Sequence, residues 1–228
     1  MKATLAIYDM DRTVTRGPTF GPFLWHAMWR LAPWRALLAP LVMLTTLAYG
    51  LKLIDRGRLK ELNYRLLVGA ASPERLEPVV QSFADKQVAT NILAGARARL
   101  AQDKAAGRRL VMATASYRLY AAAIAKRLGF DDVIATDNLT DRRGRTIATI
   151  DGRNCYGPGK LDMIEAWLQR EGLDRDAVHI RFYSDHVSDA PVHHWADEAF
   201  AANAHARLIK VAEDEGWEVL DWRDRRGA

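Results

Sequence analysis

The chain has 228 residues, of which 49% are hydrophobic and 27% are charged, the composition of an ordinary globular protein with one large domain or one domain with an insert. The only cysteine, Cys155, excludes an internal disulfide and fits a reducing compartment. The net charge of +5 favours anionic partners, but no interleaved basic and aromatic stripe is present, so we expect no nucleic acid partner.

The first predicted element is a short buried strand over residues 3–8, and acidic residues follow it directly. Asp9 and Asp11 are two residues apart, a spacing that puts both on the same side of an extended segment. Two carboxylates that face one point repel each other unless a cation or a shared proton is present. Mg²⁺ is the simplest such cation, because it takes oxygen ligands and leaves positions for water and phosphate. Thr13 adds a hydroxyl on that side. The alternative to a metal site is an ordinary polar turn after a strand.

Because the N-terminus leads straight into this strand rather than a signal peptide, we expect a cytoplasmic protein.

Residues 20–54 form the most apolar region of the chain. They include Trp25, Trp29 and Trp34, followed by a run without charge over residues 36–51. This run is shorter than the ~18 residues that a transmembrane helix needs, and it contains a proline. One interpretation is a set of cap helices whose apolar faces pack on each other and on a catalytic domain. The other is a cap that rests peripherally on the inner membrane face, with tryptophans at the headgroups and flanking Arg and Lys against anionic lipid.

Three further helices are predicted over residues 59–68, 72–88 and 94–104. The region from about residue 17 to about residue 91 is therefore a helical insert that separates the first two strands of the core.

Strands and helices alternate from residue 108 onward, which indicates a parallel sheet. We expect strands at 109–113, 132–135, 178–183 and 199–202, a hairpin arm at 146–150, an edge element at 217–220, and helices at 117–128, 160–170 and 192–196. The basic segment 223–226 is expected to be a solvated tail.

Polar residues follow these predicted strands where ligands bind in open α/β sheets, at the carboxyl ends. Thr114 and Ser116 follow the second strand, and Ser116 is also a candidate cap for the next helix. Lys160 follows a Gly/Pro turn at a helix start, where a positive charge opposes the macrodipole. Asp185 and Asp189 follow the strand at 178–183.

These four segments, in this order, resemble the four motifs of the haloacid dehalogenase superfamily. The resemblance covers nearly the whole chain. It implies an α/β fold, a Rossmann-like core with a parallel sheet plus an all-helical cap inserted after the first strand. The core would comprise residues 1–16 and 92–228, and the cap residues 17–91. A cap at this position shields the site from water and sets substrate choice.

The resemblance also implies the chemistry of a phosphomonoester hydrolase. Asp9 is expected to be the nucleophile that forms an aspartyl-phosphate. Asp11 is expected to protonate the leaving oxygen and then deprotonate the attacking water. Mg²⁺ would be bound by Asp9, by the backbone carbonyl of Asp11 and by Asp185.

Other matched positions would serve the substrate. Thr114 and Ser116 are expected to contact the phosphoryl group, and Lys160 to neutralise charge on it and on the nucleophile. Asp189 would bind the metal through water or orient another ligand. Thr13 would support the first loop.

Two departures bear on the substrate. Arg12 stands where the family often has glycine, and it either points away or reaches an anionic substrate. Residues 184–189 keep the acids but lack the pattern typical of phosphoserine phosphatases. The apolar cap looks like that of bacterial phosphatases related to phosphatidylglycerophosphatase C. We therefore expect a lipid-linked or amphiphilic phosphate, such as phosphatidylglycerophosphate.

Three alternatives stay open at this stage. In the first, the substrate would be a small phosphorylated metabolite, such as phosphoserine. In the second, the phosphoryl group would pass to an acceptor other than water, as in mutases of this fold. In the third, the chain would be a catalytically idle, membrane-associated binding module.

Overall fold

A computed structural model describes residues 3–223 of the protein. Its centre is a seven-stranded sheet in the order β4-β3-β2-β1-β5-β6-β7, in which only the β3–β4 pairing is antiparallel. The strands are β1 (Ala3–Tyr8), β2 (Arg109–Tyr117), β3 (Asp132–Thr140), β4 (Thr146–Asp151), β5 (Val178–Ser184), β6 (Glu198–Ala202) and β7 (Glu218–Leu220).

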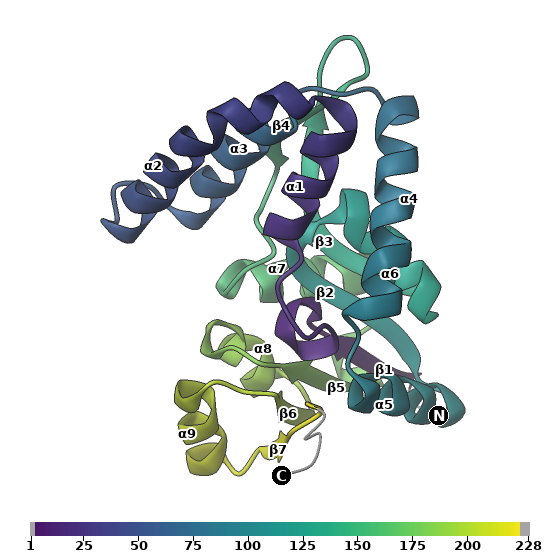
Figure 1. Ribbon diagram of the computed structural model, residues 1–228. Coiled ribbons are helices and arrows are strands. Elements are labelled where there is room, and N and C mark those ends of the chain that lie inside the picture. The colour runs from purple at the N-terminus through teal and green to yellow at the C-terminus, as the bar shows by residue number, and fades with distance from the viewer. Residues whose placement is uncertain (1–2, 224–228) are drawn as a thin grey trace.

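Helices cover both faces of this sheet (Figure 1). They are α1 (Phe20–Leu31), α2 (Ala39–Gly50), α3 (Arg56–Leu67), α4 (Pro73–Thr90), α5 (Ala94–Ala105), α6 (Arg118–Leu128), α7 (Pro158–Arg170), α8 (Ala190–Trp195) and α9 (Ala206–Glu215). Alternate side chains of β1 supply the two cores: Leu5 and Ile7 pack with Trp167 of α7, whereas Ala6 and Tyr8 pack with the helices of the opposite face. The predicted α/β fold with a helical cap is confirmed.

The helices α1 to α4 lie between the first two strands in sequence and extend beyond one end of the sheet (Figure 1). The chain leaves and re-enters the core at neighbouring points, because Thr15 and Ile92 form an isolated antiparallel bridge. Phe23 of α1 stacks on Tyr120 of α6 with ring centroids 4.4 Å apart, and Phe83 of α4 contacts both rings edge-on. These aromatic contacts fix α1 and α4 to the core. The domain boundaries at 16/17 and 91/92 stay predictions.

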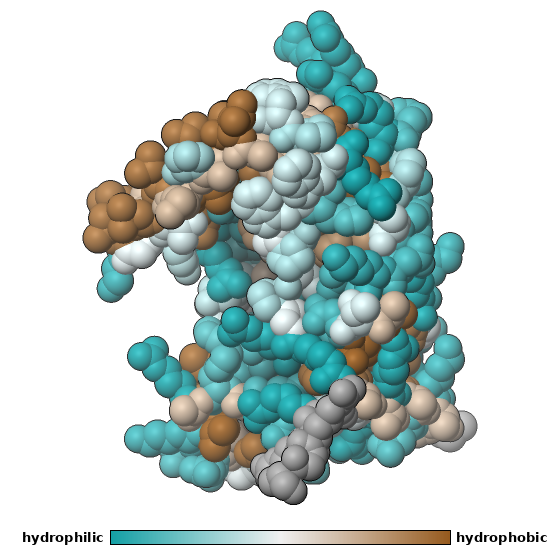
Figure 2. Space-filling model, in the orientation of Figure 1, coloured by the Kyte–Doolittle hydropathy of each residue, from teal (hydrophilic) through white to brown (hydrophobic). Residues whose placement is uncertain are grey.

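The helices α2 and α3 form an arm that projects away from the sheet (Figure 1). None of the residues of α2 is buried, although most of them are apolar. Pro40, the proline of the uncharged run, is the second residue of α2, where its missing N–H costs no hydrogen bond. Figure 2 shows the resulting apolar surface along the arm. Within residues 3–223, every helix is too short or too polar to cross a bilayer.

Two details differ from the sequence prediction, and one lies outside the described residues. The strand β2 continues through Tyr117, so the residue before α6 is Tyr117, and the prediction that Ser116 caps this helix is wrong. The helix α9 was not predicted, and it ends at Gly216, whose φ of 71° is readily adopted only by glycine. Of the predicted solvated tail, residues 224–226 lie outside the described part of the chain.

Candidate active site

The candidate site lies at the carboxyl ends of β1, β2 and β5, three neighbouring strands. Tyr8 pairs in register with Met112 on one side and with Tyr183 on the other, so the residues after them reach the same edge of the sheet. A cavity of about 400 Å³ opens there, and its lining includes Asp9, Asp11, Thr114, Lys160 and Asp185. In the space-filling view the molecule is hollowed between the arm and the C-terminal helices (Figure 2).

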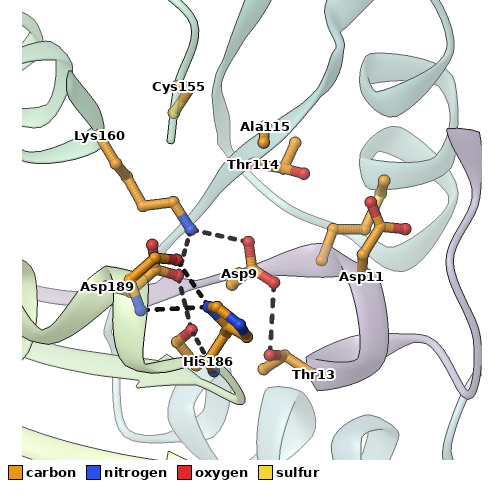
Figure 3. A network of polar contacts seen from close by, with 12 residues as sticks. Asp9, Asp11, Thr13, Thr114, Ala115, Cys155, Lys160, His186 and Asp189 are labelled. Atoms are coloured by element: carbon orange, nitrogen blue, oxygen red, sulfur yellow. Dashed lines mark hydrogen bonds and ion pairs between the residues drawn. The ribbon is translucent and has the colours of Figure 1, made fainter. Parts of the chain in front are cut away.

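Lys160 connects the predicted nucleophile to the last motif (Figure 3). Its Nζ donates to Asp9 Oδ1 at 2.8 Å and to Asp189 Oδ2 at 2.6 Å. The hydroxyl of Ser184 also donates to Asp189 Oδ2, at 2.6 Å. The turn before α7 delivers this lysine because Gly157 adopts a φ of 57° and Pro158 starts the helix. The structure thus brings together three of the predicted site residues from distant parts of the chain.

Thr13 lies between two carboxylates of the site. Its hydroxyl is 3.4 Å from Asp9 Oδ2 and 3.5 Å from Asp185 Oδ1. Asp185 Oδ2 in turn lies 3.3 Å from His205 Nε2. Thr13 can donate only one proton, so it cannot satisfy both acids at once.

The acids of the site outnumber its buried cation. Burial raises the pKa of Asp9, and the Asp189 and Asp185 carboxylates raise it further, against the opposing effect of Lys160. Burial also raises the pKa of Asp185. Burial alone would lower the pKa of Lys160, but the Asp189 and Asp9 carboxylates outweigh it and raise that pKa. The site therefore has a surplus of negative charge that a further cation would relieve.

The oxygen-rich donor set fits a hard divalent cation. Carboxylates are the ligands that Mg²⁺ prefers, and Asp189 Oδ1 is buried without a hydrogen-bond partner among the described residues. Within residues 3–223, no three His, Cys, Asp or Glu side chains are already arranged as a metal site. The assignment of Asp9, Asp11 and Asp185 as metal ligands stays a prediction.

Asp11 is held apart from the Lys160 cluster (Figure 3). Its Oδ1 accepts from the backbone N–H and the hydroxyl of Thr19, each at 2.7 Å, and its Oδ2 accepts from Ser116 Oγ at 2.7 Å. Ser116 thus orients Asp11, while its own N–H donates to Thr114 Oγ1 at 3.1 Å. Thr114 lines the cavity, in keeping with the predicted contact to a phosphoryl oxygen. Thr19 was not identified from the sequence, because its pairing with Asp11 depends on the fold of the loop between them.

Arg12 lies at the rim of the cavity. Its φ of 64° is in the left-handed region that glycine adopts most readily, which explains the family preference for glycine at this position. Its guanidinium Nη1 lies 3.3 Å from His205 Nε2, so the side chain extends across the cavity mouth rather than away from it.

Asn203, the residue after β6, holds the loop that carries Arg12 and Thr13. Its side-chain Nδ2 donates to the carbonyls of Arg12 at 3.1 Å and Thr13 at 3.0 Å, while its Oδ1 accepts from Trp222 N at 2.7 Å. Asn203 was not identified from the sequence, where the only signal is a lone asparagine after a predicted strand. In the structure it adopts a φ of 54°, a conformation that asparagine tolerates better than most residues.

Comparisons with known proteins show the family of the chain. The family model for haloacid dehalogenase-like hydrolases matches residues 6–194. A phosphoserine phosphatase of Mycobacterium tuberculosis is 30% identical over 175 residues, which cover 77% of this chain and 55% of that protein. The chain thus spans about half the length of the mycobacterial relatives that it matches.

Solved structures show the same fold. A protein of unknown function from Bordetella pertussis superposes with a TM-score of 0.86 at 24% identity, covering 97% of this chain and all of that one (100%). A substrate-bound phosphoserine phosphatase superposes with a TM-score of 0.66 at 16% identity, covering 99% of this chain and 96% of that one. The family model covers most of the chain and all four motifs predicted from the sequence. The chain therefore belongs to the haloacid dehalogenase-like hydrolases.

Proposed function

We propose that this protein is a Mg²⁺-dependent phosphomonoesterase that works through an aspartyl-phosphate on Asp9. The observation that carries the proposal is the contact of Asp9 Oδ1 with Lys160 Nζ at 2.8 Å, at the wall of a cavity large enough for a phosphate ester. Phosphate monoesters resist hydrolysis because the anionic ester repels a nucleophile and the leaving group is poor. A buried ammonium beside the nucleophile offsets that repulsion.

The metal would be held by the carboxylates of Asp9 and Asp185 and by the backbone carbonyl of Asp11. When bound, Mg²⁺ supplies charge stabilisation to the phosphoryl oxygens. The surplus of buried carboxylates around Thr13 supports such a site.

The chain's own residues then divide the chemistry. An Asp9 carboxylate oxygen attacks phosphorus, the bond from phosphorus to the ester oxygen breaks, and Asp11 gives its proton to that oxygen. In the second step Asp11 takes a proton from water, which attacks the aspartyl-phosphate and releases phosphate with Asp9 restored. Thr19 and Ser116 hold the Asp11 side chain in both steps. Lys160 compensates negative charge on Asp9 and the transferring group, and Thr114 binds a phosphoryl oxygen.

Turnover of an aryl phosphate in the presence of Mg²⁺ tests the proposal. The Asp9→Asn variant is expected to lose turnover while keeping its circular dichroism spectrum, because an amide oxygen is a poor nucleophile toward phosphorus. The matched control is Asp214→Asn, an exposed residue of α9, which is expected to keep full turnover. Full turnover of Asp9→Asn would mean that the nucleophile is another residue.

For the substrate we propose an amphiphilic or lipid-linked phosphate, such as phosphatidylglycerophosphate. A second cavity of about 280 Å³ adjoins the first, sharing Asp11, Phe20 and Arg56 with it. Its lining adds Tyr49 of α2 and Leu59 of α3, so an apolar group attached to the phosphate has a path from the site to the arm.

The arm itself supports contact with an anionic membrane. Almost all exposed large apolar side chains in the described part of the chain lie between residues 25 and 53, including Trp34 at 61%, Leu37 at 81% and Met43 at 73% exposure. Residues 12–54 contain no Asp or Glu but several Arg and Lys residues. A helix that is apolar all round is normally covered, and a bilayer with anionic headgroups matches both the apolar surface and its charge. We therefore propose a peripheral position on the cytoplasmic face of a membrane.

A small metabolite is the second candidate substrate, because the relatives and structural neighbours include phosphoserine phosphatases. A panel of phosphatidylglycerophosphate, phosphoserine and sugar phosphates separates the two. Exclusive turnover of phosphoserine would contradict the amphiphilic substrate while leaving the phosphatase proposal intact.

A further inference from the structure

Lys60 of α3 is a buried cation that the chemistry above does not use. Only 4% of the residue is exposed, and its Nζ lies 4.5 Å from the centre of the Tyr117 ring. Within residues 3–223, no carboxylate forms an ion pair with it. Burial lowers the pKa of Lys60 to about 7. Because an ammonium without a carboxylate partner is costly to bury, local stability does not explain this lysine.

The partners of Lys60 are two oxygens on separate segments of the candidate site, the end of β2 and the turn before α7. Its Nζ donates to the carbonyl of Ala115 at 2.6 Å and to Asn154 Oδ1 at 3.0 Å. Ala115 stands between Thr114 and Ser116, the residues assigned to the phosphoryl group and to Asp11. Asn154 begins the turn that delivers Lys160. One cap side chain therefore reaches the two segments whose relative position would determine where the phosphoryl group lies.

The core alone cannot satisfy both oxygens. Thr136 Oγ1, from β3, lies 3.0 Å from the Ala115 carbonyl and 2.9 Å from Asn154 Oδ1, and it accepts from Cys155 N at 3.1 Å. A hydroxyl carries one proton, so it can donate to only one of the two oxygens at a time. Without the Lys60 donors, one partly buried acceptor is left without a donor from these side chains and the two oxygens repel each other.

We propose that Lys60 is a positioning residue, which holds the 114–116 segment of β2 and the 154–160 turn together so that the site is complete only while α3 is docked. The inference rests on the proposed phosphatase function for its effect on turnover, and on geometry alone for its effect on the two segments. It also links the apolar arm to the chemistry, because α2 packs on α3 and a shift of the arm moves Lys60.

Three variants test the effect on turnover of an aryl phosphate. Lys60→Met keeps the length of the side chain but removes every donor, and kcat is expected to fall about tenfold or more, with a much smaller change in KM. Lys60→Arg keeps the charge and the donors, so it is expected to recover part of the loss. The matched control is Arg65→Met, an exposed residue of the same helix, which is expected to leave kcat unchanged.

The thiol of Cys155 gives a readout that needs no activity. It is the only cysteine of the chain, it is fully buried, and it follows Asn154 directly. If Lys60 holds the 154–160 turn, Lys60→Met should react with a thiol reagent such as dithionitrobenzoate about tenfold faster than the wild type, whereas Arg65→Met should not. Because this rate does not depend on catalysis, it decides the inference even if the wild type turns over no phosphate ester.

A second substitution approaches the same contact from the core. Asn154→Ala removes one partner of Lys60 and is expected to accelerate labelling in the same way. The double variant is expected to react no faster than the more affected single variant, because both remove one interaction. Additive effects would overturn the proposal. Wild-type kcat and wild-type labelling in a folded Lys60→Met protein would overturn it as well, and Asn154→Ala decides the matter if Lys60→Met does not fold.

Discussion

The ammonium of Lys160 and the carboxylate of Asp189 lie 2.6 Å apart, and both side chains are almost fully buried, at 2% and 4% exposure. The same ammonium contacts Asp9, so two carboxylates depend on one cation. Removing one member of a buried ion pair leaves uncompensated charge in a poorly solvated place.

Replacement of this cation should therefore be costly in two respects. Lys160→Met is expected to lower the free energy of unfolding by about 3–5 kcal/mol, as for other broken buried pairs, and to abolish turnover. Urea unfolding followed by circular dichroism measures the first effect. Lys210→Met, at an exposed position of α9, is the control and should stay within about 0.5 kcal/mol of the wild type. Unchanged stability of Lys160→Met would show that the acids are neutralised in another way.

Magnesium should stabilise the folded protein without any substrate. A ligand that binds only the native state adds about 2.7 kcal/mol at a hundredfold excess over its dissociation constant, so the melting temperature should rise with Mg²⁺ concentration. Asp185→Asn is expected to remove most of this rise, because it replaces a proposed ligand. Asp214→Asn, which is exposed, should keep it. A rise of equal size in the Asp185 variant would exclude that residue as a ligand.

The loop that carries Arg12 and Thr13 should depend on Asn203. Asn203→Gly keeps a residue that accepts the φ of 54° but removes all three hydrogen bonds, so we expect a loss of about 1–3 kcal/mol of stability and a lower kcat. Asn203→Ala adds backbone strain and should be less stable than the glycine variant. Calorimetry and aryl phosphate turnover measure the two effects. If the two variants are equally stable, the left-handed backbone conformation at residue 203 contributes nothing to the difference in the free energy of unfolding.

The apolar arm should determine membrane binding. Replacing Met43 and Leu44 of α2, which are 73% and 58% exposed, by Glu is expected to abolish co-sedimentation with vesicles that contain phosphatidylglycerol. The control is Leu139→Glu, an exposed leucine of β3, which should sediment like the wild type. Equal loss in both variants would indicate a general charge effect. Failure of the wild type to sediment at low salt would remove the membrane proposal.

The sequence predicted those parts of the site in which side chains follow short, strongly apolar strands. Asp9 and Asp185 reach one edge of the sheet as expected because the parallel strands β1 and β5 end there, a constraint that requires no knowledge of the loops. Lys160 reaches the same edge from the first turn of α7. The helix boundaries were correct to within a few residues, because apolar periodicity fixes the middle of a helix better than its ends.

The sequence failed where a contact involves a residue that no motif or strand end marks. Lys60 and Asn203 contact residues more than 50 positions away, and nothing in their local sequence distinguishes them from solvated residues. Ser116 was assigned to a helix start because serine favours that position, but in the structure its hydroxyl donates to Asp11 instead.

The aromatic contacts among Phe23, Phe83 and Tyr120 restrict how the entrance to the site can change shape. These rings join α1 and α4 to α6. A rigid-body rotation of all four cap helices would therefore separate three buried rings. The α2 helix has no buried residue, so its movement would expose far less apolar surface to water. If the substrate is bulky, we therefore expect it to enter by a movement of α2 rather than by a movement of the whole cap.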